Sequence, residues 1–186
     1  MTLHLVALGA NTGATPAANA RVLLRAVGRI GGAVALSRAW ATPAWPPGAG
    51  PDFVNAAAVI HAPIPPAAML ARLARVEARA GRVRDRRWGP RILDLDLVAA
   101  GQLVRPDPAT VRRWIGLDAD AQARDAPETL ILPHPRLQDR AFVLGPLGDV
   151  APRWRHPLTG RSVAAMWAAL PGHARAAARP MPWPGV

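Results

Sequence analysis

Four short stretches of the chain are rich in apolar residues and bounded by glycine or proline, a pattern typical of β-strands. They span residues 3–9, 33–41, 53–61 and 92–99. Between the second and the third, residues 42–52 contain four prolines and two glycines, which predicts a loop rather than regular structure. The pattern therefore indicates a sheet built from these four strands.

Two segments with apolar residues at helical spacing lie between the strands. The first opens at Thr15-Pro16, a capping residue followed by a first-turn proline, and ends at Gly31-Gly32. The second begins at Pro65-Pro66 and ends at Gly81. The resulting order, β-α-β-β-α-β, predicts the α+β class: a ferredoxin-like sandwich with a largely antiparallel sheet and helices on both faces.

The periodic pattern is less regular beyond residue 100. Residues 105–128 are polar and carry three prolines, which indicates an insertion with one short helix near 109–116. We expect a short strand at 130–132 and helices at 141–150 and 163–170.

The C-terminal stretch 171–186 contains four prolines and is expected to be loosely ordered. We therefore expect one domain over residues 1–152, with an extension at 153–186 that packs on it or trails from it. No stretch is long and apolar enough for a transmembrane helix, and no secretory leader is recognised at the N-terminus. We expect a cytoplasmic monomer without membrane partners.

Composition narrows the range of chemistry. Of the 186 residues, 51% are apolar, which excludes a wholly disordered chain, and the lack of cysteine excludes disulfide and thiolate chemistry. All 23 basic residues are arginine, and the net charge is +11. Residues 72–91 hold eight arginines against two acids, a net +6, and residues 153–186 hold five arginines and no acid, a net +5. Such a basic window favours an anionic partner: nucleic acid, an acidic membrane or a phosphorylated small molecule.

Two aspartates on the last predicted strand are the most informative candidates for chemistry. Side chains alternate along a strand, so the leucines of residues 93–97 would enter the core while Asp94 and Asp96 share the opposite face. Two carboxylates beside an arginine-rich loop suit magnesium and polyphosphate, because magnesium is commonly held by carboxylates together with phosphate oxygens. The alternative is a solvent-facing strand that happens to carry two aspartates.

Taken together, several segments resemble the 6-hydroxymethyl-7,8-dihydropterin pyrophosphokinase family of folate biosynthesis. The similarity covers roughly residues 3–152, and it is carried by residues 6–13, 42–43, 51–56, 81–84, 87–97 and 132–142. The resemblance implies an enzyme that transfers the terminal pyrophosphate of ATP to the hydroxymethyl group of the pterin and releases AMP. It further implies two Mg²⁺ ions, with ATP as co-substrate.

The resemblance also implies roles for individual residues. The metal ligands would be Asp94 and Asp96, which with Arg82 and Arg91 form the catalytic set. Pterin would be bound by Thr42, Pro43, Trp45, Phe53, Asn55, Trp88 and Phe142. ATP would be bound by Glu77, Arg82, Arg84, Arg91, His134 and Arg140.

Two features depart from the family pattern: the atypical loop after Pro43, where Trp45 would stack on the pterin or gate the pocket, and the long segment 105–128. The main alternative function is a basic RNA-binding module on a ferredoxin-like sheet. The paired aspartates argue against it, since carboxylates repel phosphates unless a metal lies between them. A catalytically inactive relative is the other alternative.

Overall fold

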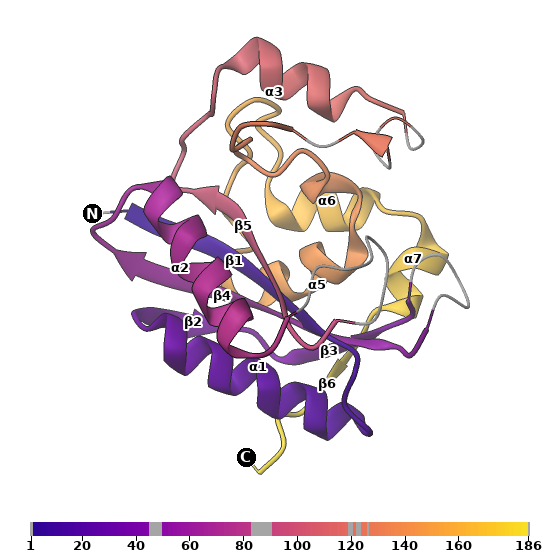
Figure 1. The fold of residues 1–186 in the computed structure, drawn as a ribbon. Helices are drawn as coiled ribbons and strands as arrows, with labels where there is room; N and C mark the ends of the chain where they lie inside the picture. The colour runs from indigo at the N-terminus through magenta and orange to yellow at the C-terminus, as the bar shows by residue number, and fades with distance from the viewer. Residues whose placement is uncertain are drawn as a thin grey trace.

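A six-stranded antiparallel sheet forms the middle layer of this computed structural model (Figure 1). The structure describes residues 2–44, 50–82, 91–118, 121, 124–125 and 127–185. The strands are β1 (Thr2–Ala10), β2 (Ala33–Leu36), β3 (Ala39–Thr42), β4 (Phe53–Ala62), β5 (Asp94–Ala100) and β6 (Arg179–Met181). They are ordered β5-β1-β4-β3-β6, and β2 also pairs with β4. The predicted ferredoxin-like arrangement is confirmed.

Helices α1 (Pro16–Ile30) and α2 (Pro66–Arg79) cover one face of the sheet. Thr15 caps α1, since its hydroxyl oxygen accepts a hydrogen bond from the N–H of Ala18 at 3.1 Å. The apolar stripe of α1 packs on β1 and β4 and that of α2 packs on β5, with Leu23 and Leu73 almost fully buried.

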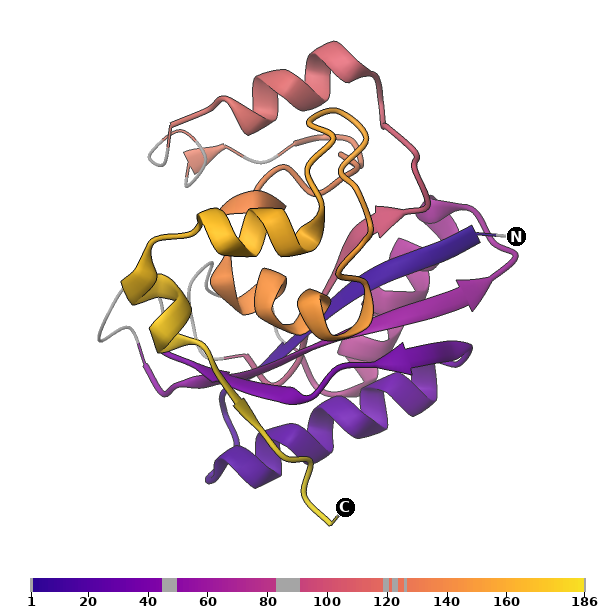
Figure 2. The same cartoon turned by 180° about the vertical axis from the view of Figure 1, so that it is seen from behind.

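Helices α5 (Ala141–Val150) and α6 (Val163–Ala169) cover the other face, as Figure 2 shows. They form a second core in which Leu144 and Met166 pack with Leu5 and Val59 of the sheet. The polypeptide reaches α5 through α3 (Pro108–Ile115), which is the short helix expected there, and through the one-turn 3₁₀ helix η1 (Leu137–Asp139). None of the helices in the described part of the chain has the length and apolar character needed to cross a bilayer.

The single strand expected at 33–41 is in fact two strands, β2 and β3. The break falls at Ser37, whose hydroxyl accepts a hydrogen bond from the N–H of Ala57 (2.9 Å) and donates one to the carbonyl of Arg38 (2.7 Å). A side chain thus takes the place of a backbone partner, and the regular ladder stops there.

The expectation of a loosely ordered stretch at 171–186 is wrong. Residues 172–177 form helix α7, and β6 pairs antiparallel with β3 at the edge of the sheet. The indole N–H of Trp183 donates to the carbonyl of Ser37 at 2.9 Å. The strand expected at 130–132 is reduced to one isolated bridge, between Arg105 and Leu132.

Candidate active site

The alternation expected in β5 is observed. Leu95 and Leu97 are buried in the core beneath α1 and α2, whereas Asp94 and Asp96 lie on the opposite face and are partly exposed. Antiparallel pairing places Asp94 beside Gly9 of β1, and Asp96 beside Ala7. Both carboxylates therefore face the side of the sheet that carries α5.

Asp94 is held between two arginines that sit at the two ends of the basic loop. Arg82 Nη1 lies 2.6 Å from Asp94 Oδ1, and Arg91 forms an ion pair with the other carboxylate oxygen. Arg82 also pairs with Glu77, which is buried near the end of α2. Glu77 Oε1 accepts a hydrogen bond from the N–H of Leu95 at 2.7 Å, so this acid ties α2, Arg82 and β5 together.

Asp96 has a different environment. It lines a shallow pocket together with Val98, Leu137, Val143 and two of the predicted ATP contacts, His134 and Arg140. No hydrogen bond or ion pair joins it to another described residue. One carboxylate of the pair is therefore neutralised by arginines, while the other opens into the pocket.

His134 is held as a neutral ring. Burial, together with the nearby Arg140 and Arg136, lowers the pKa of His134 to about 3. Its Nδ1 accepts a hydrogen bond from the N–H of Arg136 at 3.1 Å. A neutral imidazole that accepts at Nδ1 carries its proton on Nε2, so His134 offers a single hydrogen-bond donor.

Arg140 lies beside His134 at the start of α5. Burial lowers its pKa, while the carboxylate of Asp96 acts in the opposite direction. Its guanidinium carbon lies 5.4 Å from the ring centre of Phe142. The first turn of α5 therefore presents a cation and an aromatic ring together.

The predicted pterin pocket begins on β4, which is separated from β5 by β1. Asn55 on β4 is buried, and its Nδ2 donates to the hydroxyl of the equally buried Thr42 at 2.8 Å. Phe53 pairs with Thr42 across β3 and β4 and is half-buried, while Pro43 is exposed. The other predicted site residues, Trp45, Arg84 and Trp88, lie outside the described residues.

Gly9 joins the carboxylate cluster to this pocket, and sequence reasoning missed it. It pairs with Asp94 on one side and with Asn55 on the other. A Cβ at this position would lie 2.9 Å from Asn55 Oδ1 and 3.6 Å from the ring of Phe53. Only a residue without a side chain leaves that space open.

Asn11 was also missed, although it follows the glycine of β1 closely. Its N–H donates to the carbonyl of Arg91 (3.0 Å), and its Oδ1 accepts from the N–H of Arg91 (2.7 Å). Its Nδ2 donates to the carbonyl of Pro51 at 3.1 Å. One buried amide thus fixes both chain segments that re-enter the fold beside the site.

The side chains of the site could hold the predicted magnesium ions only together with oxygens of a bound substrate. Among residues outside the gaps of the structure, no group of three or more His, Cys, Asp or Glu gathers as metal ligands. Asp94 and Asp96 supply two carboxylates on one face, and a triphosphate would supply the remaining oxygens. The two ions remain a prediction.

Comparison with known proteins identifies the family. The sequence model of 7,8-dihydro-6-hydroxymethylpterin-pyrophosphokinase matches residues 5–152. The chain belongs to this family. The pyrophosphokinase match includes all of the site residues predicted above and ends within the turn after α5.

Individual relatives agree with this assignment. Proteins named 2-amino-4-hydroxy-6-hydroxymethyldihydropteridine pyrophosphokinase are 37% identical over 168 residues in Pseudomonas aeruginosa and 35% over 153 in Methylorubrum extorquens. These matches cover 89% and 82% of this chain, and 90% and 84% of the relatives. A Synechocystis relative is 33% identical over 131 residues, 66% of this chain, and the match spans only 57% of its length.

Solved structures of the family share the fold. A substrate complex described as HPPK-DHPS superimposes with a TM-score of 0.64 at 12% identity, over 90% of this chain and 43% of the other. The wild-type Plasmodium falciparum HPPK-DHPS gives 0.62 at 13% identity, over 90% and 44%. The chain thus spans less than half of these longer proteins.

Proposed function

We propose that this chain transfers the terminal pyrophosphate of ATP to the hydroxymethyl group of 6-hydroxymethyl-7,8-dihydropterin and releases AMP. The family match and the names of the relatives support this activity. The observation that carries it is the pair of carboxylates on β5, with Asp94 held between Arg82 and Arg91. The RNA-binding alternative is not supported, since the comparisons identify a pyrophosphokinase.

The reaction needs position and charge neutralisation rather than a side-chain nucleophile. The hydroxyl oxygen of the pterin bonds to the β-phosphorus, the bond from that phosphorus to the α,β-bridging oxygen breaks, and the hydroxyl proton passes to solvent. Arg82 and Arg91, which neutralise Asp94 in this structure, are placed to neutralise phosphate oxygens when a triphosphate binds. Arg84 is proposed to join them.

Asp94 and Asp96 would hold two magnesium ions against the triphosphate. When bound, these ions would supply positive charge to the phosphate oxygens. His134, through its Nε2–H, and Arg140 would add two donors on the ATP side. Glu77 would act by fixing Arg82 and β5, to which it is bonded.

The pterin would be recognised by its edge and by its faces. Asn55 and Thr42 form a buried polar pair that suits the donor and acceptor edge of a heterocycle, with Pro43 beside them. Phe53 and Phe142 would stack on the two faces of the ring, and they make no ring contact with each other in the described structure. Trp45 and Trp88 are proposed to complete the pocket.

The division into a pyrophosphokinase domain at 1–152 and an extension at 153–186 stays a proposal, as do the monomeric state and the cytoplasmic location. The extension supplies α6, which joins the second core, α7, which contacts α5, and β6, which pairs with β3.

The test is AMP release from ATP and hydroxymethyldihydropterin, with and without magnesium. We expect release to depend on both substrates and on the metal, and Asp96→Ala to lose nearly all turnover while keeping its circular dichroism spectrum. Glu128→Ala, which removes an exposed carboxylate outside the site, is the matched control. A folded Asp96→Ala protein with full activity would contradict the metal assignment. Tight, salt-dependent RNA binding without AMP release would favour the alternative function.

A further inference from the structure

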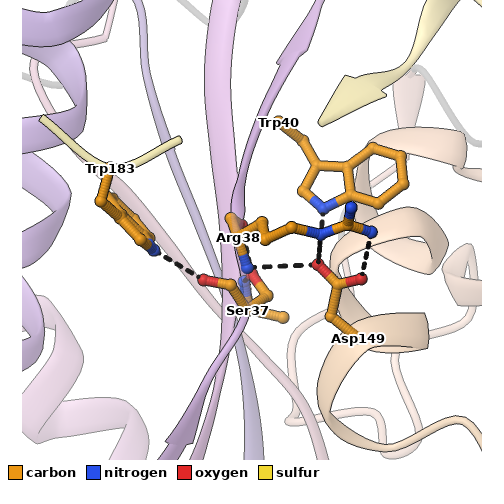
Figure 3. A network of polar contacts seen from close by, with 6 residues as sticks. Ser37, Arg38, Trp40, Asp149 and Trp183 are labelled. Atoms are coloured by element: carbon orange, nitrogen blue, oxygen red, sulfur yellow. Dashed lines mark hydrogen bonds and ion pairs between the residues drawn. The ribbon is translucent and has the colours of Figure 1, made fainter. Parts of the chain in front are cut away.

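The far end of α5 is fastened to the sheet by one carboxylate. Asp149, in the last turn, accepts hydrogen bonds at Oδ2 from the indole N–H of Trp40 (3.0 Å) and from the backbone N–H of Arg38 (3.1 Å) (Figure 3). The guanidinium of Arg38 adds bonds of 3.2 Å to Oδ2 and 2.8 Å to Oδ1. The Asp149 side chain is only 17% exposed, whereas that of Arg38 is 58% exposed. The bonds from Trp40 and the Arg38 backbone are therefore the sheltered part of the anchor.

The middle of α5 rests directly on the same indole. A Cβ at Gly145 would lie 2.9 Å from Trp40 Cζ3 and 3.3 Å from Trp167 Cζ3. The rings of Trp40 and Trp167 are packed edge to face, with centroids 5.7 Å apart. Trp40 is 6% exposed, so the helix, its glycine and the two indoles form one closely packed unit.

Trp40 also belongs to the strand that builds the proposed pterin pocket. It pairs with Asn55 across β3 and β4, two residues before Thr42. The other end of α5 carries Phe142, about 10 Å along the helix from Asp149 at 1.5 Å per residue. One indole thus links the strand that offers the amide edge to the helix that offers the aromatic ring.

The first turn of α5 lacks one of the usual backbone hydrogen bonds of a helix. Pro146 lies inside α5 and has no N–H to donate to the carbonyl of Phe142, four residues earlier. The direction in which Phe142 points therefore depends on how the rest of the helix is seated. The helix is seated by Leu144 in the second core and by the contact with Trp40 and Asp149.

We propose that Trp40, Gly145 and Asp149 form a positioning brace that sets the distance between the Phe142 ring and Asn55, and so the affinity for the pterin. This inference rests on the proposed function. The brace affects the two substrates differently. Phe142 has a short side chain and follows the helix, while Arg140 has a long flexible stem that adapts to a displaced helix.

The experiment measures KM for each substrate, and the dissociation constant of the pterin by calorimetry, in wild type and variants. We expect Asp149→Ala to raise the KM and the dissociation constant of the pterin about tenfold, with kcat and the KM of ATP changed less than about twofold. Asp149→Asn keeps an oxygen acceptor for the indole and should stay within about twofold of wild type. Gly145→Ala retains the Asp149 carboxylate but forces the helix off the indole, so it should reproduce the pterin defect even if Asp149→Ala does not fold.

Two controls separate the brace from general effects. Gly148→Ala changes the same helix at a site where the new methyl group meets nothing within 4 Å. Arg38→Ala removes the exposed ion pair but leaves the bond between Trp40 and Asp149. Both should bind pterin as wild type does.

The proposal is overturned if Asp149→Ala and Gly145→Ala are folded and bind pterin normally, or if KM rises equally for both substrates. A wild-type protein that binds pterin but releases no AMP would refute the proposed function. The pterin dissociation constants of wild type and variants would then still test the positioning brace. Failure of the wild type to bind pterin refutes both.

Discussion

At the scale of single residues, the site depends on two uncharged residues, Gly9 and Asn11, as much as on its charged groups. Gly9 leaves room between Asp94 and Asn55, and Asn11 holds the backbone at Arg91 and at Pro51. Neither residue is proposed to contact a substrate, but each fixes the position of residues that are. The positions of the carboxylates and arginines therefore depend on the backbone geometry that these two residues maintain.

Gly9→Ala should selectively weaken pterin binding. The new Cβ would come within 2.9 Å of Asn55 Oδ1, so the amide must move. We expect the KM for pterin to rise at least about tenfold, with the KM of ATP nearly unchanged, in steady-state assays of AMP release. Gly28→Ala meets nothing within 4 Å on α1 and serves as the control. Equal behaviour of the two variants would show that the space at Gly9 has no role.

Asn11→Ala should lower kcat/KM for both substrates. It removes the two hydrogen bonds of a buried side chain, one accepted from the N–H of Arg91 and one donated to the carbonyl of Pro51. Buried polar groups left without partners cost about 1–3 kcal/mol, so we expect a loss of roughly 10- to 100-fold. Thr12→Ala, at the exposed neighbouring position, should be neutral. Normal kinetics of Asn11→Ala would refute the positioning role.

At the scale of elements, the interruption between β2 and β3 joins the C-terminal segment to the middle of the sheet. Ser37 lies in that interruption and contacts Ala57 of β4 by its hydroxyl and Trp183 by its carbonyl. The C-terminal segment therefore contributes to the geometry of a strand that also carries Trp40 and Thr42.

Trp183→Phe tests this contribution by removing one indole N–H while keeping an aromatic ring. The carbonyl of Ser37 loses its donor, so we expect the free energy of unfolding in urea to fall by about 1 kcal/mol. Trp114→Phe, at a half-buried indole on α3, is the matched substitution and should cost less. If the two variants unfold alike, the bond to Ser37 does not stabilise the fold.

Sequence patterns predicted the elements whose signal is local and periodic. The strand carrying Asp94 and Asp96 was correct because alternation along a strand is visible within seven residues. The interruption at Ser37 was not visible, since it depends on a hydroxyl that bonds twenty residues away. Strand β6 is three residues long and contains Pro180, so it carries no pattern of its own and forms only because β3 offers an edge.

The same reasoning applies to the site. Asp94, Asp96, Asn55 and the arginines were proposed as site residues because their residue types are unusual in their segments. Asn11 was not found, because its partners lie 40 and 80 residues away and only the folded sheet brings them together.

For the whole molecule, three histidines with lowered pKa values predict how stability depends on pH, of which His4 and His156 are fully buried and His134 is partly exposed. Burial lowers the pKa of His4, of His156 and of His134, the last to about 3, from an ordinary value of 6.5. Below pH 6.5 the unfolded chain therefore binds protons that the folded chain does not, so the free energy of unfolding falls as pH decreases. Each such histidine would contribute up to about 2 kcal/mol of this loss at pH 5.

Urea unfolding at pH 7.5 and pH 5 measures the effect. His4→Gln cannot take up the proton, so its loss of stability between the two pH values should be smaller than that of the wild type. His61→Gln, at an exposed position, is the control. An identical loss in the wild type and in His4→Gln would exclude His4 as a source of the acid sensitivity.

The placement of β6 also bears on the solution behaviour of the protein. A bare edge strand exposes unpaired backbone groups to which another chain can add, which is a route to aggregation. In this protein β6 covers β3, and Pro180 within it lacks the N–H that a further strand would need. A chain ending before Arg179 would uncover β3 and should be prone to self-association through that edge. Strand β6 thus prevents a strand of another molecule from pairing with this edge of the sheet.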